Sequence, residues 1–210
     1  MKTNELLLCA VLFIIWLYVL SVFKKRRLAA FHYILGASGL FIFVFLLFKK
    51  PLTLGISHIV LFLMDLLGKL TGFFTVFADY NLIFIDNSRC SISMYIDYEC
   101  CGVIEILVLV CLVLFYPLFG PVKKLIYSIL GAVYIMAANI FRLFVVSLVI
   151  YYFGNDAYYI SHAVVGRIVF YILTILLYFY LLSYNQIKNQ RVGRFDYGKD
   201  NAAGEKTEEK

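Results

Sequence analysis

Long apolar runs, each closed by a short basic cluster, open this chain of 210 residues. Residues 6–23 form the first run and end at the basic cluster 24–27. Residues 28–48 form the second run and end at Lys49, Lys50 and Pro51. A helix that crosses a bilayer needs about 20 consecutive apolar residues, and both runs meet that length. The pattern therefore predicts an integral membrane protein.

Further apolar runs predict further crossings. Three of them are long and strongly apolar, whereas two are weaker because polar side chains interrupt them more often. The weak pair are either spans or re-entrant pieces, and the sequence leaves this open. We expect an all-α fold, a polytopic integral membrane helical bundle of about seven spans, with roughly five to eight as the range. The strong runs are residues 102–119, 125–153 and 163–183, and the weak runs are residues 52–68 and 70–85.

Composition agrees with a membrane chain and limits the kinds of partner. Hydrophobic residues make up 63% and charged residues 15% of the chain, against about 45–50% and about 25% in soluble domains. The formal charge of +6 is gathered beside the apolar runs, where basic residues set membrane topology. We therefore expect the lipid bilayer, and no nucleic acid, as a partner. The sequence has no metal-ligand spacing and no phosphate-binding glycine loop, so no cofactor and no metal are expected.

The basic clusters also predict the orientation of the chain. The positive-inside rule places clusters 24–27 and 123–124 in the cytoplasm. Run 102–119 ends beside the second cluster, so Cys100, at its other end, lies outside. Because the first cluster lies inside, an odd number of crossings, either one or three, separates it from Cys100. The polar segment 86–99 therefore lies outside, in a multi-pass cell-membrane protein whose C-terminus is cytoplasmic. Residues 49–50 are a local exception to the rule, because they face outward.

Two regions of different character divide the chain. Residues 1–187 form the predicted integral membrane domain, and the polar motifs described next fall within residues 99–183. Residues 188–210 mix charged side chains with Asn and Gly and have no apolar periodicity. We expect that segment to be a disordered cytoplasmic tail.

Arg142 and Asn139 are polar residues inside the apolar run 125–153. A charged side chain within a span costs about 2.5–3.5 kcal/mol, so it marks a functional site by default. The two residues lie three positions apart on one helix face, and Arg142 lies about 25 Å from the inner end of the run. Snorkelling to the outer headgroups is one explanation for Arg142. The deeper Asn139 instead favours a polar cluster between helices.

Two neighbouring spans bring further reactive groups to the same membrane face. Cys100 and Cys101 precede run 102–119, and His162 begins the last span with Gly166 one turn inward. A thiol, an imidazole and a guanidinium together suit acyl transfer. The thiolate attacks, the imidazole moves a proton, and the guanidinium stabilises the oxyanion. These residues predict a cysteine peptidase or transpeptidase.

Glu105 and the second cysteine leave alternatives open. Helical spacing pairs Cys101 with Glu105 on one face, so by spacing alone either Cys100 or Cys101 can be the reactive thiol. Glu105 is a carboxylate within a span. It either forms an ion pair with Arg142 or Arg167 or helps to bind a basic or polar substrate.

Three motifs in this order resemble those of the exosortase/archaeosortase family of membrane cysteine transpeptidases, most closely its Gram-positive exosortase G type. They are a Cys-x-Gly at residues 100–102, an Asn-x-x-Arg at residues 139–142, and His162 followed by Gly166. The resemblance covers residues 99–183. It implies Cys100 as the nucleophile, with Arg142 and His162 completing the catalytic site. The candidate supporting residues are Asn139, Cys101, Glu105 and Gly166.

The resemblance also implies a substrate and a place of action. The substrate is an exported, membrane-tethered protein with a C-terminal sorting signal: a short motif, a transmembrane helix and a basic end. The enzyme cuts this signal at the extracytoplasmic face and passes the protein to an acceptor. A lipid or an envelope component is the candidate acceptor.

Two other functions compete with this one. A thiol-disulfide oxidoreductase is suggested by Cys90, Cys100 and Cys101, although no CxxC is present and a bridge between adjacent cysteines is strained. In a non-enzymatic scaffold for envelope polymer assembly, the polar residues would only hold helices together. Cys9 and Cys111 lie within apolar runs, where a cysteine acts as a small hydrophobe.

Overall fold

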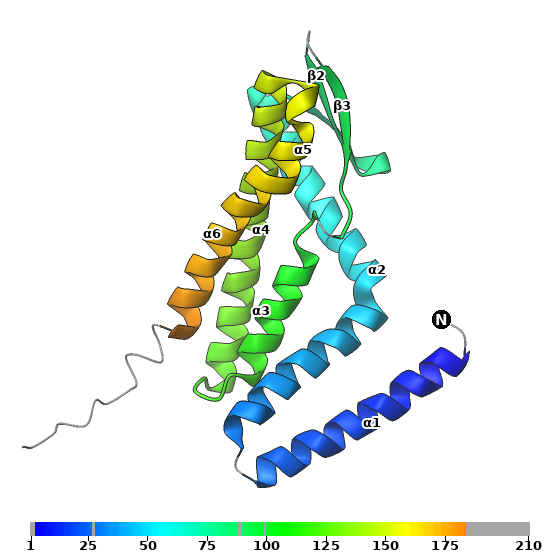
Figure 1. Cartoon of the computed structure of the whole chain (residues 1–210), viewed down its shortest axis with the longest axis vertical. Coiled ribbons are helices and arrows are strands. Elements are labelled where there is room, and N and C mark those ends of the chain that lie inside the picture. The colour runs from blue at the N-terminus through cyan, green and yellow to red at the C-terminus, as the bar shows by residue number, and fades with distance from the viewer. Residues whose placement is uncertain (1–2, 27, 88–89, 99, 184–210) are drawn as a thin grey trace, which may run out of the picture. The chain divides into compact units, whose positions relative to one another are not determined.

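The computed structural model describes residues 3–26, 28–87, 90–98 and 100–183 (Figure 1). The chain divides into two compact units, Met1–Leu177 and Tyr178–Lys210. All elements that position the candidate site belong to the first unit. The predicted disordered tail, residues 188–210, lies outside the described residues.

Helices make up most of the described chain, and the predicted helical membrane fold is confirmed. Two helices, α2 and α4, and the stretch Asn155–Leu181 are long and apolar enough to cross a bilayer, and α3 is a shorter apolar helix. The helices are α1 (Thr3–Lys25), α2 (Ala29–Thr71), α3 (Val103–Phe115), α4 (Pro121–Phe153), α5 (Tyr158–Ile160) and α6 (Gly166–Tyr178). A π-helical turn, η3 (Ser161–Val165), connects α5 to α6.

One bent helix, α2, takes in the second apolar run and the first weak run. It has 43 residues and at 1.5 Å per residue is about 64 Å long, roughly twice the thickness of the hydrocarbon layer. Pro51 lies inside it, where it removes a backbone donor and kinks a helix. The helix changes direction partway along its length (Figure 1). It ends at Gly72, which adopts a left-handed φ of 73° and donates its N–H to the Gly68 carbonyl at 2.7 Å.

A three-stranded antiparallel sheet follows α2. This sheet was not expected from the sequence. Its strands are β1 (Thr75–Phe77), β2 (Leu82–Asn87) and β3 (Cys90–Tyr95), in the order β1-β2-β3. Ile83 pairs with Met94 and Ile85 with Ile92 across the β2–β3 register. Residues 52–85, which the sequence left open as two spans, therefore complete α2 and continue into strands. The left-handed turn at Gly72 ends the helix before the run is over.

The sheet and the second half of α2 pack against the second half of α4. Ile83, Ile85 and Met94 of the sheet are buried in one apolar cluster, together with Met64 of α2 and Val146 of α4. Each such side chain contributes about 1.5–3 kcal/mol when fully buried. Cys100 and Cys101 belong to the same cluster. This core therefore holds the segment that carries the two cysteines.

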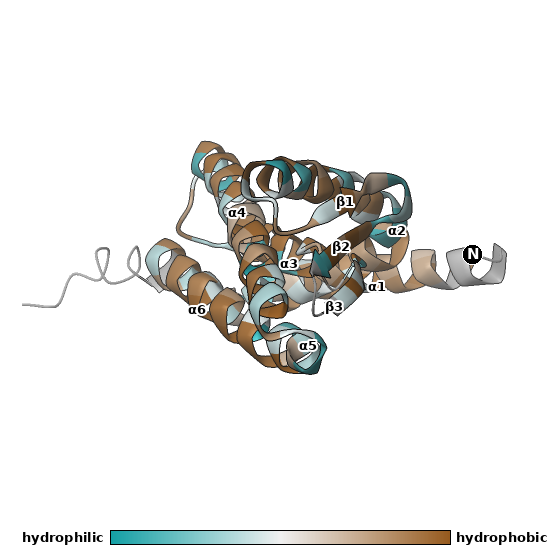
Figure 2. Cartoon of the chain, turned by 90° about the horizontal axis from the view of Figure 1, so that it is seen from above, coloured by the Kyte–Doolittle hydropathy of each residue, from teal (hydrophilic) through white to brown (hydrophobic). Residues whose placement is uncertain are grey.

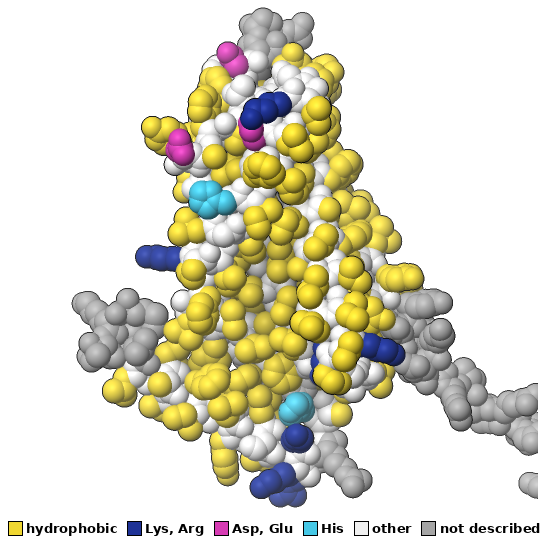
Figure 3. Space-filling model, turned by 180° about the vertical axis from the view of Figure 1, so that it is seen from behind, with side chains coloured by type: hydrophobic (Ala, Val, Ile, Leu, Met, Phe, Trp, Pro, Cys, Tyr) yellow, Lys and Arg dark blue, Asp and Glu magenta, His cyan; other side chains and the backbone are white. Residues whose placement is uncertain are grey.

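The lateral surface of the helices is hydrophobic. Large apolar side chains are exposed along α1, α2, α4 and α6, and most of each helix is brown in Figure 2. In Figure 3 hydrophobic side chains cover the middle of the face shown, while acidic side chains lie toward the upper end and Lys or Arg side chains lie at both ends and at the edges. Such a surface suits contact with lipid tails rather than with water.

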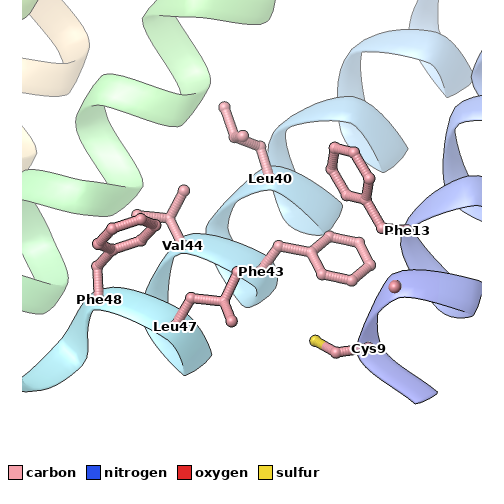
Figure 4. Close-up of a pocket in the computed structure, with 8 residues that line it drawn as sticks. Cys9, Phe13, Leu40, Phe43, Val44, Leu47 and Phe48 are labelled. Carbon is pink, nitrogen blue, oxygen red and sulfur yellow. The ribbon is translucent and has the colours of Figure 1, made fainter. Parts of the chain in front are cut away.

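Aromatic side chains join α1 to α2. The Trp16 indole donates its Nε1–H to the Leu35 carbonyl at 2.9 Å, and Phe13 meets Phe43 edge to face. Beside this contact, apolar side chains of both helices enclose a pocket of about 380 Å³ (Figure 4). Among the described residues that line it, Cys9 supplies the one thiol. The pocket shares no residue with the candidate site described next.

Candidate active site

A short turn that begins at Asp97 and ends at Gly102, just before α3, carries Cys100, and we call it the cysteine turn. The backbone N–H groups of Cys100 and Cys101 both donate to the Asp97 carbonyl, at 2.9 and 3.0 Å. Gly102 then reverses the chain with a left-handed φ of 79°, and α3 begins at the next residue. The turn is tied to the sheet side of the molecule because the Ile96 N–H donates to the Asn81 carbonyl at 2.9 Å.

The thiol of Cys100 meets the imidazole of His162. Their Sγ and Nε2 atoms are 3.4 Å apart, although the residues are 62 positions apart in the chain. His162 lies in the π-helical turn η3, a geometry that occurs often at functional sites. The pair can transfer a proton directly: the thiol donates to neutral Nε2, and an imidazolium N–H then donates to the thiolate.

Asn139 holds the cysteine turn from α4. Its Nδ2 donates to the Cys100 carbonyl at 2.8 Å, and the side chain is completely buried. Its Oδ1 has no hydrogen-bond partner in the part of the chain that the structure describes. The amide predicted to belong to a polar cluster thus contacts the backbone of the predicted nucleophile.

Arg142 lies one turn beyond Asn139 and is only 6% exposed. Its guanidinium carbon lies 5.6 Å from the centre of the Phe170 ring. A Cβ at Gly166 would come within 2.8 Å of the Val146 Cγ2 and 3.4 Å of the Arg142 Nε, so the glycine lets α6 approach α4 closely beside Arg142. Among the described residues nothing hydrogen-bonds this Nε. Such burial differs from the snorkelling geometry that was the alternative for Arg142.

One pocket of about 310 Å³ brings the three predicted catalytic residues together. Glu105 and Arg167 also line it. Within the described ranges, no ion pair within 4.0 Å joins Glu105 to either arginine. The pocket therefore presents separate cationic and anionic groups around the thiol. Its lining residues are Cys100, Ile104, Glu105, Arg142, His162, Arg167, Phe170 and Tyr171.

The two adjacent thiols have different surroundings. Cys101 is completely buried, does not line the pocket, and directs its Sγ toward the Tyr98 carbonyl at 3.7 Å. Burial raises the pKa of the Cys101 thiol to about 11, so it remains protonated at neutral pH. Cys100 instead faces the pocket and His162. The geometry favours Cys100 over Cys101 as the reactive thiol.

The aromatic wall of the pocket was missed by the sequence analysis. Phe170 and Tyr171 line the pocket from α6, but aromatic residues in an apolar run fit lipid contact equally well. The spacing of four between His162, Gly166 and Phe170 was a usable signal, because residues four apart share a helix face.

Groups outside the pocket have ordinary surroundings. Cys111 is buried in α3. In the described part of the chain, no three His, Cys, Asp or Glu side chains cluster closely enough to hold a metal ion.

Comparison with known proteins identifies the family of the chain. Residues 2–179 match the family described as transmembrane exosortase. No curated protein and no solved structure matches the chain. The match includes both helices that precede the sheet as well as the segment that carries the three motifs. The chain belongs to the transmembrane exosortase family.

Proposed function

We propose that this protein is a membrane-embedded cysteine peptidase or transpeptidase that cleaves the C-terminal sorting signal of an exported, membrane-tethered protein. One observation carries the proposal: the Cys100 Sγ lies 3.4 Å from the His162 Nε2 in a pocket that also contains the buried Arg142. Membership of the exosortase family supports the same general role.

The first chemical step forms an acyl-enzyme. His162 takes the thiol proton of Cys100, and the thiolate attacks the carbonyl carbon of the scissile peptide bond. The carbonyl oxygen becomes an oxyanion, toward which the Arg142 guanidinium can direct fixed N–H donors. When the tetrahedral intermediate collapses, the C–N bond breaks and His162 protonates the leaving amine. The products are a thioester on Cys100 and the released signal helix.

The second step releases the protein from the thioester. A nucleophile, either water or an acceptor, gives a proton to His162 and attacks the thioester carbonyl. The C–S bond then breaks and the Cys100 thiol is regenerated. Water yields a free carboxylate, whereas a lipid or envelope acceptor yields a transpeptidation product.

The proposed subtype is the Gram-positive exosortase G type, supported by the three motifs. Charge placement supports an extracytoplasmic site. Lys24 and Lys25 lie in the last turn of α1, and Lys123 and Lys124 lie in the first turns of α4. These connections lie at one end of the first unit, and the sheet and α5 lie at the other (Figure 1). Because basic ends favour the cytoplasm, the sheet end and the Cys100 turn face outward. The C-terminus then faces the cytoplasm.

The experiment compares membrane proteins of cells that carry the wild-type chain or Cys100→Ala. Mass spectrometry of C-terminal fragments should find proteins that lose their terminal helix in wild-type cells and keep it with Cys100→Ala. Cys111→Ala is the matched control, because that thiol is buried in α3 away from the pocket. Cells with this variant should remove the terminal helix as wild-type cells do. Normal maturation in Cys100→Ala cells would overturn the proposal.

Cys90→Ser separates peptidase from redox chemistry. A peptidase with Cys100 as its nucleophile needs no second thiol, so processing should continue in this variant. A requirement for Cys90 would favour thiol-disulfide exchange instead.

A further inference from the structure

Lys49 and Lys50 are cations that the proposed chemistry does not use. Residues 29–48 of α2 rise about 30 Å, the thickness of the hydrocarbon layer. The lysine pair therefore lies at the boundary opposite to Lys24 and Lys25, which end α1. Lysine is disfavoured on that side by the positive-inside rule. Its presence there calls for a local reason.

The pair borders a pocket of about 270 Å³, which we call the lysine pocket. Thr53 of α2, Asn81 before β2 and Tyr98 of the cysteine turn also line it. Thr53 lies one helical turn beyond the lysines, on the same face of α2. A volume near the lower end of the range for small-molecule sites suits a headgroup better than a peptide segment.

The described residues neutralise the positive charge of the lysine pocket only in part. The Lys49 Nζ lies 3.2 Å from the centre of the Tyr98 ring and 5.4 Å from that of Phe45, which fixes its stem and head. In the described ranges, no carboxylate lies within 4.0 Å of Lys49 or Lys50. Among the described residues that line this pocket, Asp97 is the one acidic residue, and its side chain accepts the Tyr98 N–H at 2.7 Å. Two ammonium groups therefore face one carboxylate.

Two buried polar atoms of the lysine pocket lack partners. The Thr53 Oγ1 and the Asn81 Oδ1 are shielded from solvent and make no hydrogen bond within the described residues. Buried polar atoms of this kind normally find a partner. The hydroxyl can donate to an anion, and rotation of the amide can present its NH₂ group to the same ligand.

We propose that the lysine pocket binds a phosphate-bearing anion at the level of the lipid headgroups. Phosphate oxygens match two ammonium groups, a hydroxyl and an amide, and the headgroup layer supplies phosphate at this depth. The ligand would lie against Tyr98 and Asp97, whose carbonyl holds the Cys100 and Cys101 N–H groups. Binding does not depend on the proposed peptidase chemistry.

The test measures lipid retention on the purified full chain by native mass spectrometry. Anionic phosphatidylglycerol is offered against zwitterionic phosphatidylcholine. Wild-type protein should retain phosphatidylglycerol in preference to phosphatidylcholine. In Lys49→Gln/Lys50→Gln the ratio of the two retained lipids should fall by about tenfold or more, which is the effect of losing one charge-assisted contact. Lys24→Gln/Lys25→Gln removes a matched lysine pair from α1 and should keep the wild-type ratio. Lys49→Arg/Lys50→Arg should also keep this ratio, because the charge is kept.

Further arms identify the source of the anion and guard against misfolding. Displacement of the lipid by inorganic phosphate would show that the phosphate group suffices, and failure to displace it would assign the pocket to an intact lipid. Thr53→Val keeps the shape and charge of the side chain but removes its hydroxyl. The variant should therefore fold normally and retain the lipid a few-fold less well. The proposal is overturned if Lys49→Gln/Lys50→Gln retains the lipid like wild type, or if the α1 pair matters equally.

Discussion

At the scale of single residues, Arg142 has the most specific role in the proposed mechanism. Its side chain is buried beside Phe170, where Gly166 allows α6 to approach α4 closely. A guanidinium presents a planar fork of donors, whereas a lysine presents a compact point charge. The shape of the group should therefore matter as much as its charge.

Arg142→Lys should slow processing of a Cys100-dependent substrate by about 100-fold or more, the usual cost of losing an oxyanion donor. Processing is measured in isolated membranes from the ratio of mature to uncleaved protein. Arg167→Lys is the control, since Arg167 is exposed at the pocket, and it should lower the rate much less. Wild-type rates with Arg142→Lys would remove Arg142 from the oxyanion role.

Gly102 is a second residue whose type is dictated by geometry. Its φ of 79° lies in the left-handed region, which costs a residue with a Cβ about 1–2 kcal/mol. Gly102→Ala should therefore lower the free energy of unfolding by about that amount. Gly120→Ala is the control because its φ is −70° and no atom lies within 4 Å of an added Cβ. Equal thermal midpoints in detergent for the two variants would contradict this assignment.

Sequence alone found the polar residues of the pocket but not its apolar ones. Cys100, Arg142 and His162 stand out because polar groups are costly within spans. Phe170 and Tyr171 carry no such cost, so only helical spacing from His162 could reveal them. Whether Glu105 meets Arg142 or Arg167 depends on side-chain geometry that spacing leaves open.

At the scale of elements, the sheet determines where the nucleophile lies. Ile85 and Met94 are buried against α2 and α4, and the chain passes from β3 directly into the cysteine turn. Sequence patterns could not predict this sheet, because a buried strand and a weak membrane span are both continuous apolar runs. Serines alternate with apolar residues in β3, where Ser91 and Ser93 are exposed.

Ile85→Ala should destabilise the protein by about 2–4 kcal/mol, because it leaves a cavity in this core. Because the cysteine turn would lose its support, Cys100 should also move away from His162, and the rate at which its thiol is alkylated should fall. Phe77→Ala is the control at a side chain that is 51% exposed. Unfolding in detergent and mass spectrometry of alkylated Cys100 measure the two effects. An unchanged melting curve for Ile85→Ala would contradict the role of the sheet.

At the scale of the whole molecule, the bend in α2 changes how the chain is placed in the bilayer. The part before Pro51 is long enough to span, and the part after it packs against the sheet. We propose that the chain crosses the membrane once between the first basic cluster and Cys100, an odd number as the basic clusters predict. The sequence predicts an odd number of crossings before Cys100 more reliably than it predicts the total number of spans. The odd number follows from the basic clusters, whereas the total depends on whether the weak runs cross the membrane.

Labelling of single introduced cysteines tests this placement. Ser91→Cys, at an exposed position of β3, should react with a membrane-impermeant maleimide in intact cells. Lys123→Cys, in the first turn of α4, should react only after the membrane is permeabilised. Background labelling is set by the unsubstituted chain. The reverse pattern would place the proposed site in the cytoplasm.

The central claim is that Cys100 carries the acyl group during processing. Trapping a thioester on the protein, digesting it and locating the adduct by mass spectrometry tests this claim most directly. We expect a fragment of the substrate on Cys100, present with Cys111→Ala and absent with Cys100→Ala. An adduct on Cys101, or substrate cleavage that proceeds with no adduct on Cys100, would contradict the account.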